Sequence, residues 1–232
     1  GTINGYTART APIFLPNQVG GYMPAKPGVM GQAGFGPRDP DQADAMQTAL
    51  ARGLVVVSPG ARGRTQATGK APAAIVDLKA AVRYLKHNDA AMPGDANRII
   101  SNGTSAGGAL SVLLGASANQ PDYEPHLKAL GAADAPDDIF AVSAYCPISI
   151  LEQADGAYEW EFNGVDDYAK IDMRQIDFHV ERKLVKGVLT SEQKKVSSQL
   201  KPLFTGYVNA LHLLGPDGRK LSLDAQGNGS FK

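Results

Sequence analysis

The sequence contains a single cysteine, Cys146, in 232 residues. An intramolecular disulfide and a cysteine-based zinc cluster each need at least two cysteines, so both kinds of scaffold are excluded. No apolar run approaches the roughly 18 residues of a transmembrane helix, and we therefore expect no membrane partner. Residue 1 is Gly rather than Met, so we expect that the natural start of translation lies upstream of it.

An excess of one charge sign is also absent. The 23 Lys and Arg residues balance the 23 Asp and Glu residues, which gives a formal net charge of zero. Nucleic-acid binding depends on cationic side chains that replace the counterions of the phosphates, so no nucleic-acid partner is expected. Hydrophobic residues make up 43% of the chain and charged residues 20%. This balance is typical of a globular protein and argues against a disordered chain.

Strand-like and helix-like segments alternate through the first 146 residues. The strand-like runs are residues 11–15, 54–57, 98–101 and 139–146. The helical patterns between them are residues 39–52, 72–87 and 108–116. Asp39 is the expected N-cap of the first helix, with Gln42 completing a capping box and Gly53 ending it. Strands that alternate with helices predict an α/β fold with a parallel sheet.

Two of these segments carry more detailed expectations. The run 54–57 has no polar alternation, which is typical of a strand covered on both faces. The helix 72–87 has one apolar stripe, formed by Ile75, Leu78, Val82 and Leu85. Its cations Lys79, Arg83 and Lys86 are expected to face solvent. Asp137 and Asp138 lack metal-ligand spacing and are expected to be solvated loop charges.

The alternation ends before residue 150. In residues 150–232 a helix is expected from about Thr190, and its apolar side consists of Val196, Leu200, Leu203, Phe204, Tyr207, Val208 and Leu211. Residues 215–218 have the composition of a turn, and Leu221 and Leu223 alternate with polar residues as in a hairpin arm. This part is therefore interpreted as an insertion or cap over the sheet.

The motif with the most chemical content is Gly103-Thr104-Ser105-Ala106-Gly107, which fits G-x-S-x-G between an expected strand and an expected helix. A nucleophile elbow requires that order, and small neighbours allow the strained turn at its serine. The N-terminus of the helix would stabilise negative charge that develops at the serine. The alternative is a tight turn whose glycines only allow the strand and the helix to pack closely.

Nucleophilic attack by Ser105 requires a base for its proton and two fixed N–H donors for the oxyanion. The backbone N–H of Ala106 is one expected donor, because Ala106 follows the nucleophile. Gly20-Gly21 would supply the second from the loop after the first strand, since glycine lets a backbone amide approach a substrate closely. An ordinary turn is the alternative for Gly20-Gly21.

The pattern offers no clear general base. In this fold the acid and the histidine follow late strands, whereas the histidines after Ser105 are His126, His179 and His212. His126 falls in an expected loop, and the other two fall in the cap-like region. Each is expected to be a surface or packing residue, with His179 the strongest catalytic candidate of the three. The sequence therefore predicts that the catalytic base lies outside it.

The remaining motifs call for no cofactor. Residues 60–64, Gly-Ala-Arg-Gly-Arg, follow a strand but lack a phosphate-binding glycine pattern. A structural loop is therefore expected there. Nothing in the sequence requires a metal or an organic cofactor.

Five segments have distinctive amino-acid sequences, namely Pro16–Tyr22, Ser58–Arg64, Asn102–Ala109, Ser143–Ile148 and Ala157–Trp160. Together they resemble bacterial tannase, and the similarity runs from about Thr2 to Lys232. That family consists of α/β-hydrolase serine esterases with feruloyl-esterase relatives, and it cleaves galloyl and similar phenolic-acid esters. The resemblance implies that residues 1–149 are the middle part of an α/β-hydrolase core and that residues 150–232 begin an inserted lid domain.

The resemblance also implies roles for individual residues. Ser105 corresponds to the nucleophile, Gly21 and Ala106 correspond to the oxyanion donors, and Ile148 borders the pocket for the aromatic acyl group. The catalytic Asp and His of the family, and several residues that bind the galloyl hydroxyls, lie in a C-terminal part with no counterpart here. We therefore expect a phenolic-acid ester substrate and a second polypeptide that carries the Asp and His. A feruloyl esterase and a noncatalytic phenolic-binding fragment are the alternatives.

Overall fold

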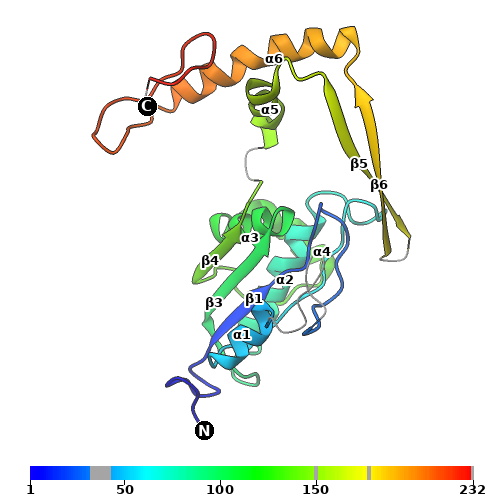
Figure 1. The fold of residues 1–232 in the computed structure, drawn as a ribbon. Coiled ribbons are helices and arrows are strands. Elements are labelled where there is room, and N and C mark those ends of the chain that lie inside the picture. The colour runs from blue at the N-terminus through cyan, green and yellow to red at the C-terminus, as the bar shows by residue number, and fades with distance from the viewer. Residues whose placement is uncertain (32–42, 149–150, 177–178, 231–232) are drawn as a thin grey trace. The chain divides into compact units, whose positions relative to one another are not determined.

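A computed structural model describes residues 1–31, 43–148, 151–176 and 179–230, with the side chains of 173–180 excepted. The chain divides into two compact units, residues 1–149 and residues 150–232. The first unit contains a parallel sheet and the helices that cover it (Figure 1). The second contains helices and a two-stranded antiparallel sheet. That the second unit is a lid stays a prediction.

The sheet of the first unit has four parallel strands in the order β2-β1-β3-β4. The strands are β1 (Pro12–Pro16), β2 (Val55–Val56), β3 (Asp95–Thr104) and β4 (Ala141–Tyr145). The predicted α/β fold with a parallel sheet is therefore confirmed. The predicted covering of residues 54–57 on both faces is not borne out within the described residues, because the two valines of β2 are only half-buried. In that part of the chain β2 is also the last strand on its side of the sheet.

The helices of the first unit are α1 (Ala45–Ala51), α2 (Ala73–His87), α3 (Ala106–Ala116) and α4 (Glu124–Leu130). The expected N-cap Asp39 lies outside the described residues. In the structure α1 begins at Ala45, where Asp44 is the N-cap and forms a capping box with Gln47. The helix ends before Gly53, as predicted, and Gly53 has φ +84°. The same Asp-x-x-Gln pattern thus occurs twice, and the described cap is the second occurrence.

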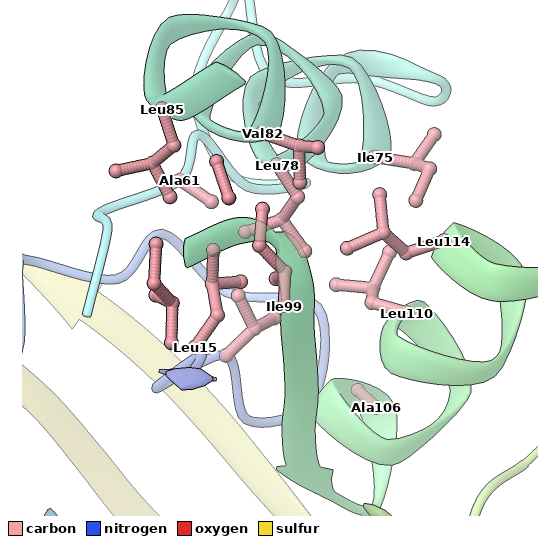
Figure 2. Packing of buried hydrophobic residues seen from close by; sticks show 13 residues of the cluster. Leu15, Ala61, Ile75, Leu78, Val82, Leu85, Ile99, Ala106, Leu110 and Leu114 are labelled. Carbon is pink, nitrogen blue, oxygen red and sulfur yellow. The ribbon is translucent and has the colours of Figure 1, made fainter. Parts of the chain in front are cut away.

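The hydrophobic core lies between the sheet and two helices. The predicted stripe of Ile75, Leu78, Val82 and Leu85 is buried and contacts the central strands β1 and β3. Figure 2 shows these side chains of α2 meeting Leu15 and Ile99, together with side chains from α3. Fully burying an aliphatic side chain of this size contributes about 1.5–3 kcal/mol to the free energy of unfolding. The core therefore fixes α2 and α3 against the two strands that precede the site.

Three charges predicted to be solvated are enclosed instead. Lys79 and Arg83 are buried in α2, and the Asp137 side chain is 1% exposed. Lys79 Nζ lies 2.8 Å from Asp137 Oδ1, and Arg83 Nη2 lies 2.8 Å from Asp137 Oδ2. The partners are 58 and 54 positions apart, so no local pattern reveals the pairing. Asp138 is half exposed and binds Lys86. The Lys86 side chain was predicted to face solvent, but it is only 9% exposed.

The second unit contains α5 (Ala154–Phe162), β5 (Asp167–Ile176), β6 (His179–Val188) and α6 (Ser191–Ala210). The predicted helix from Thr190 is confirmed, with Thr190 as its N-cap. The predicted turn at 215–218 is confirmed by a hydrogen bond of 2.9 Å from Gly218 N to Gly215 O. Sequence reasoning missed α5 and the β5–β6 hairpin, whose strands interleave charged and apolar residues. That weak alternation was the only sequence signal for the two strands of the hairpin.

The two units differ in how well they bury apolar residues. All buried hydrophobic side chains of the described chain lie between Ala11 and Leu127, inside the first unit. In the second unit, α5 and α6 meet through the rings of Trp160 and Phe204, whose centroids lie 5.6 Å apart. Among the helices that the structure describes, none combines the length and the apolar character that a membrane crossing needs.

Candidate active site

The residues predicted to form the site follow the carboxyl ends of three parallel strands. Gly21 lies in the loop after β1, Ser105 comes directly after β3, and Ile148 follows β4. The strands are parallel, so these ends share one edge of the sheet, and ligands of open α/β sheets bind at this edge. Ile148 is 45% exposed and available to a ligand. The topology therefore brings the predicted residues to one edge.

Ser105 occupies a strained turn between β3 and α3. Its φ is +58° and its ψ is −120°, a combination that costs an L-residue about 1–3 kcal/mol. The surrounding structure holds this conformation, because Ser105 N donates to Tyr145 O at 2.9 Å and Ser105 O accepts from Ala109 N at 2.9 Å. Ser105 is also the N-cap residue of α3, so its hydroxyl lies where the helix dipole favours negative charge.

The glycines around Ser105 are required by close contacts. A Cβ on Gly107 would lie 2.6 Å from Asn17 Oδ1 and 2.8 Å from Val19 O. A Cβ on Gly108 would lie 2.6 Å from Tyr145 O, and one on Gly103 would run into the carbonyl group of Gly107. These contacts are far shorter than real Cβ atoms tolerate. The glycines thus allow both the strained serine and the packing of α3 on β3 and β4.

Several backbone N–H groups at this edge have no acceptor within the described residues, and the two predicted oxyanion donors are among them. One belongs to Ala106, the first residue of α3, which is 1% exposed. The other belongs to Gly21, which has φ +58° in a turn closed by a 3.0 Å hydrogen bond from Met23 N to Gly20 O. Backbone donors without an intramolecular acceptor are the groups that an oxyanion hole needs.

A neighbouring loop fixes the turn that contains Gly21. Arg64 Nε donates to Gly21 O at 2.8 Å, and Arg64 N donates to Tyr22 O at 2.8 Å. Burial raises the pKa of Tyr22 above its ordinary value, so its phenol is neutral at physiological pH. Arg62, in the same loop, binds Asp77 at 2.7 Å. The predicted structural role of residues 60–64 agrees with these contacts.

The described histidines do not complete a triad with Ser105. His126, predicted to lie in a loop, lies instead in α4 on an exposed face. It lines a pocket of about 350 Å³ with Arg62 and Lys70, and none of Ser105, Ala106 and Gly21 lines that pocket. His212 follows α6 and is exposed, and the side chain of His179 lies outside the described residues. No hydrogen bond to Ser105 Oγ occurs within the described part of the chain.

Sequence reasoning missed one residue of this region. Asn17 is 7% exposed, and its side chain hydrogen-bonds to segments on both sides of Ser105. Its position directly after a strand was the only signal for it. Among the described side chains, no group of three or more His, Cys, Asp or Glu residues is arranged to hold a metal.

A parallel sheet with a strained serine turn between β3 and α3 defines an α/β-hydrolase. The family model BD-FAE matches residues 12–200. The chain belongs to the BD-FAE family.

Solved structures of bacterial tannases are similar to the whole chain. A tannase of Fusobacterium nucleatum is 54% identical, with a TM-score of 0.87, over 100% of this chain and 50% of its own. A tannin acyl hydrolase of Lactobacillus plantarum is 50% identical, with a TM-score of 0.85, over 99% of this chain and 50% of its own. The chain thus spans about half the length of these relatives.

A curated relative matches part of the chain. Esterase LipC of Mycobacterium tuberculosis is 31% identical over 118 residues, which are 51% of this chain and 25% of LipC.

Proposed function

We propose that the chain is the nucleophile-bearing part of a serine ester hydrolase that cleaves galloyl and related phenolic-acid esters. The observation that carries the proposal is the strained conformation of Ser105, at φ +58° between β3 and α3, beside the unpaired N–H of Ala106. Similarity to solved tannases at 50–54% identity supports the substrate class. Solved tannin acyl hydrolases that the chain matches were determined in complex with ethyl gallate and with 3,4-dihydroxybenzoate.

The reaction proceeds through an acyl-enzyme. Ser105 Oγ attacks the ester carbonyl while a histidine removes its proton, and the tetrahedral oxyanion accepts hydrogen bonds from the N–H groups of Ala106 and Gly21. The intermediate collapses, the carbon–oxygen bond to the alcohol breaks, and the alcohol leaves with the proton from the histidine. Water then attacks the acyl-enzyme with the same general base and releases the phenolic acid. Ile148 borders the aromatic ring of the acyl group.

The histidine and its aspartate come from a polypeptide region outside these 232 residues, in our proposal a second polypeptide. Two features support this arrangement. Within the described residues β4 pairs only with β3 and β2 only with β1, so both edges of the sheet are open to a further strand. The second unit has no buried hydrophobic side chain in its described part, although Leu184, Leu203 and Leu214 are each more than 60% exposed.

A fluorophosphonate serine probe tests the nucleophile. In an intact-mass spectrum recorded under denaturing conditions, we expect a single adduct on this 24.4 kDa chain, together with a second polypeptide. Ser105→Ala should abolish the adduct, whereas Ser198→Ala, at an exposed position in α6, should retain it. Wild-type protein that remains unlabelled would overturn the esterase proposal and favour a noncatalytic phenolic-binding fragment. If the spectrum shows one longer, uncleaved chain instead, only the proposal of a separate second polypeptide would be overturned.

Substrate preference is tested by kcat/KM on methyl gallate and methyl ferulate. Gallate carries its hydroxyls on the ring that bears the carboxyl group, whereas ferulate adds a vinyl spacer and a methoxy group. We expect the higher kcat/KM for methyl gallate. A clear preference for methyl ferulate would assign the chain to a feruloyl esterase instead.

A further inference from the structure

Asn17 lies where two parts of the candidate site meet. It follows β1 directly, and its backbone N donates to Asn102 O at 2.9 Å, which extends the pairing of β1 with β3 by one residue. The residue is 7% exposed. A buried amide side chain must satisfy both its donor and its acceptor groups, so its contacts define what it holds together.

The side-chain nitrogen of Asn17 binds segments on both sides of Ser105. Nδ2 lies 3.0 Å from Asn102 O, 3.0 Å from Gly107 O and 3.0 Å from Ser111 Oγ. The first acceptor lies near the end of β3 and the other two lie in α3. Carbonyl oxygens only accept hydrogen bonds, so these contacts require the nitrogen, and not the oxygen, at this position.

The side-chain oxygen of Asn17 faces the loop that follows it. Oδ1 accepts a hydrogen bond of 3.3 Å from Val19 N, directly before Gly20 and Gly21. One side chain therefore connects the loop that carries the Gly21 N–H to the turn that carries the Ala106 N–H. Loops otherwise move more than the elements that they connect.

The glycines of the G-x-S-x-G motif make room for this side chain. A Cβ on Gly103 would lie 2.7 Å from Asn17 Nδ2, and a Cβ on Gly107 would lie 2.6 Å from Asn17 Oδ1. The Asn17 amide thus fills the space left by the missing Cβ atoms. Its contacts are with the motif itself, which distinguishes it from a residue that only packs the core.

We infer that Asn17 is a positioning residue that holds the Gly21 and Ala106 N–H groups in register as an oxyanion hole, an inference that rests on the proposed esterase function. The donors act on the oxyanion only when they are preorganised, because reorganisation during the reaction would cost rate. Misplacement by about 1 Å typically lowers a rate by about 10²-fold. Asn17 affects the tetrahedral state and leaves ground-state binding of the aromatic ring unchanged.

The decisive variant is Asn17→Asp, assayed in the complete enzyme, that is, this chain with the region that supplies the Asp and His. The substitution keeps the shape but replaces the donor by an acceptor facing Asn102 O and Gly107 O. We expect kcat on methyl gallate to fall by about 10²-fold with little change in KM. An arylboronic acid forms a tetrahedral adduct with the serine oxygen, and its Kd should rise by a similar factor.

The boronate Kd separates positioning from a structural role. A loss of folded enzyme would lower kcat but leave the Kd of the remaining active sites unchanged. Asn17→Ser keeps one donor and adds no charge, so its kcat and boronate Kd should lie between those of wild type and Asn17→Asp. If Asn17→Asp does not fold, Asn17→Ser tests the positioning role in its place. Asn209→Asp is the matched control, since Asn209 Nδ2 and Oδ1 bind Leu223 O and N at 2.9 and 2.8 Å in the other unit. It should leave kcat and Kd unchanged.

The outcomes distinguish the two proposals. A boronate Kd that stays at the wild-type value in Asn17→Asp and Asn17→Ser would overturn the positioning role, even if kcat fell. A wild-type enzyme that neither hydrolyses methyl gallate nor binds the boronate would overturn the proposed function itself.

Discussion

The ammonium group of Lys79 lies 2.8 Å from the carboxylate of Asp137, and both side chains are enclosed, with exposed fractions of 0% and 1%. Arg83 binds the other carboxylate oxygen, and Asn119 N donates to Oδ1 at 2.8 Å. The carboxylate therefore joins α2 to the chain after α3 and to the segment that leads into β4. Because Ser105 N is bonded to Tyr145 O at the end of β4, this cluster supports the same sheet that positions the serine.

Replacing Asp137 by Asn should destabilise the protein strongly. Lys79 would lose the carboxylate that binds it, while Arg83 would keep its salt bridge to Glu124. Breaking a buried pair by removing one partner costs about 3–5 kcal/mol. The free energy of unfolding in urea measures the loss. Asp138→Asn is the matched control, because Asp138 is half exposed and its carboxylate is partly solvated. Its loss should therefore cost less than the loss of Asp137, nearer to the roughly 0–1 kcal/mol that is typical of exposed pairs. Equal losses in the two variants would contradict the assigned role of the buried cluster.

The stability of the protein should fall in acid, partly through Asp137. Burial raises the pKa of this carboxyl, but hydrogen bonds from Lys79, Asn119 and Arg83 outweigh burial and hold the pKa below its ordinary value of 3.8. The carboxylate therefore contributes stability that is fully present above that ordinary value and is lost as the pH falls through the lower folded-state pKa. Urea unfolding below about pH 4 should show a shallower pH dependence in Asp137→Asn than in wild type. Parallel curves would contradict this assignment.

Gly107→Ala should damage the serine turn. The new Cβ would lie 2.6 Å from Asn17 Oδ1 and 2.8 Å from Val19 O, and overpacking of this kind costs about 1–3 kcal/mol. We expect lower thermal stability and slower labelling of Ser105 by a fluorophosphonate. The control is Gly206→Ala in α6, where a Cβ meets nothing within 4 Å. That change should stabilise the helix by up to about 1 kcal/mol and leave labelling unaffected.

Thr190→Ala should weaken the start of α6. The Thr190 hydroxyl accepts from Gln193 N at 3.3 Å, and Gln193 Oε1 accepts from Thr190 N at 2.9 Å. Loss of the capping side chain costs about 1 kcal/mol, and hydrogen exchange of the first amides of α6 should become faster. Thr190→Ser retains the hydroxyl and should exchange like wild type. Identical exchange in Thr190→Ala would mean that tertiary contacts, and not the cap, hold this end.

Local patterns were sufficient for part of the fold. The apolar stripe of α2 and the apolar side of the helix from about Thr190 repeat at the spacing of a helix, so a few neighbouring residues carry the signal. The strained turn at Ser105 was also expected, because a serine in a sharp turn between a strand and a helix needs small residues on both sides. Its role as nucleophile stays a prediction.

Contacts between residues that are far apart in the sequence could not be predicted from such local patterns. A cation on the outer side of an amphipathic pattern normally faces solvent, and Lys79 departs from that pattern because Asp137 lies beside it in the fold. The β5–β6 hairpin was missed because its strands are rich in charged residues and have only a weak alternation. Val55 and Val56 were expected to be covered on both faces, but they are only half-buried within the described residues.

The amino-acid sequence was enough to predict the parallel α/β fold, the helix stripes and the G-x-S-x-G turn, because each depends on the spacing of near neighbours. Which charges are buried, and which groups meet at the carboxyl edge of the sheet, emerged only from the folded chain. Asn17 lies 90 positions before Gly107, and the register of β1 with β3 brings the Asn17 amide against the Gly107 carbonyl. Such contacts depend on strand order and register, which no short pattern encodes.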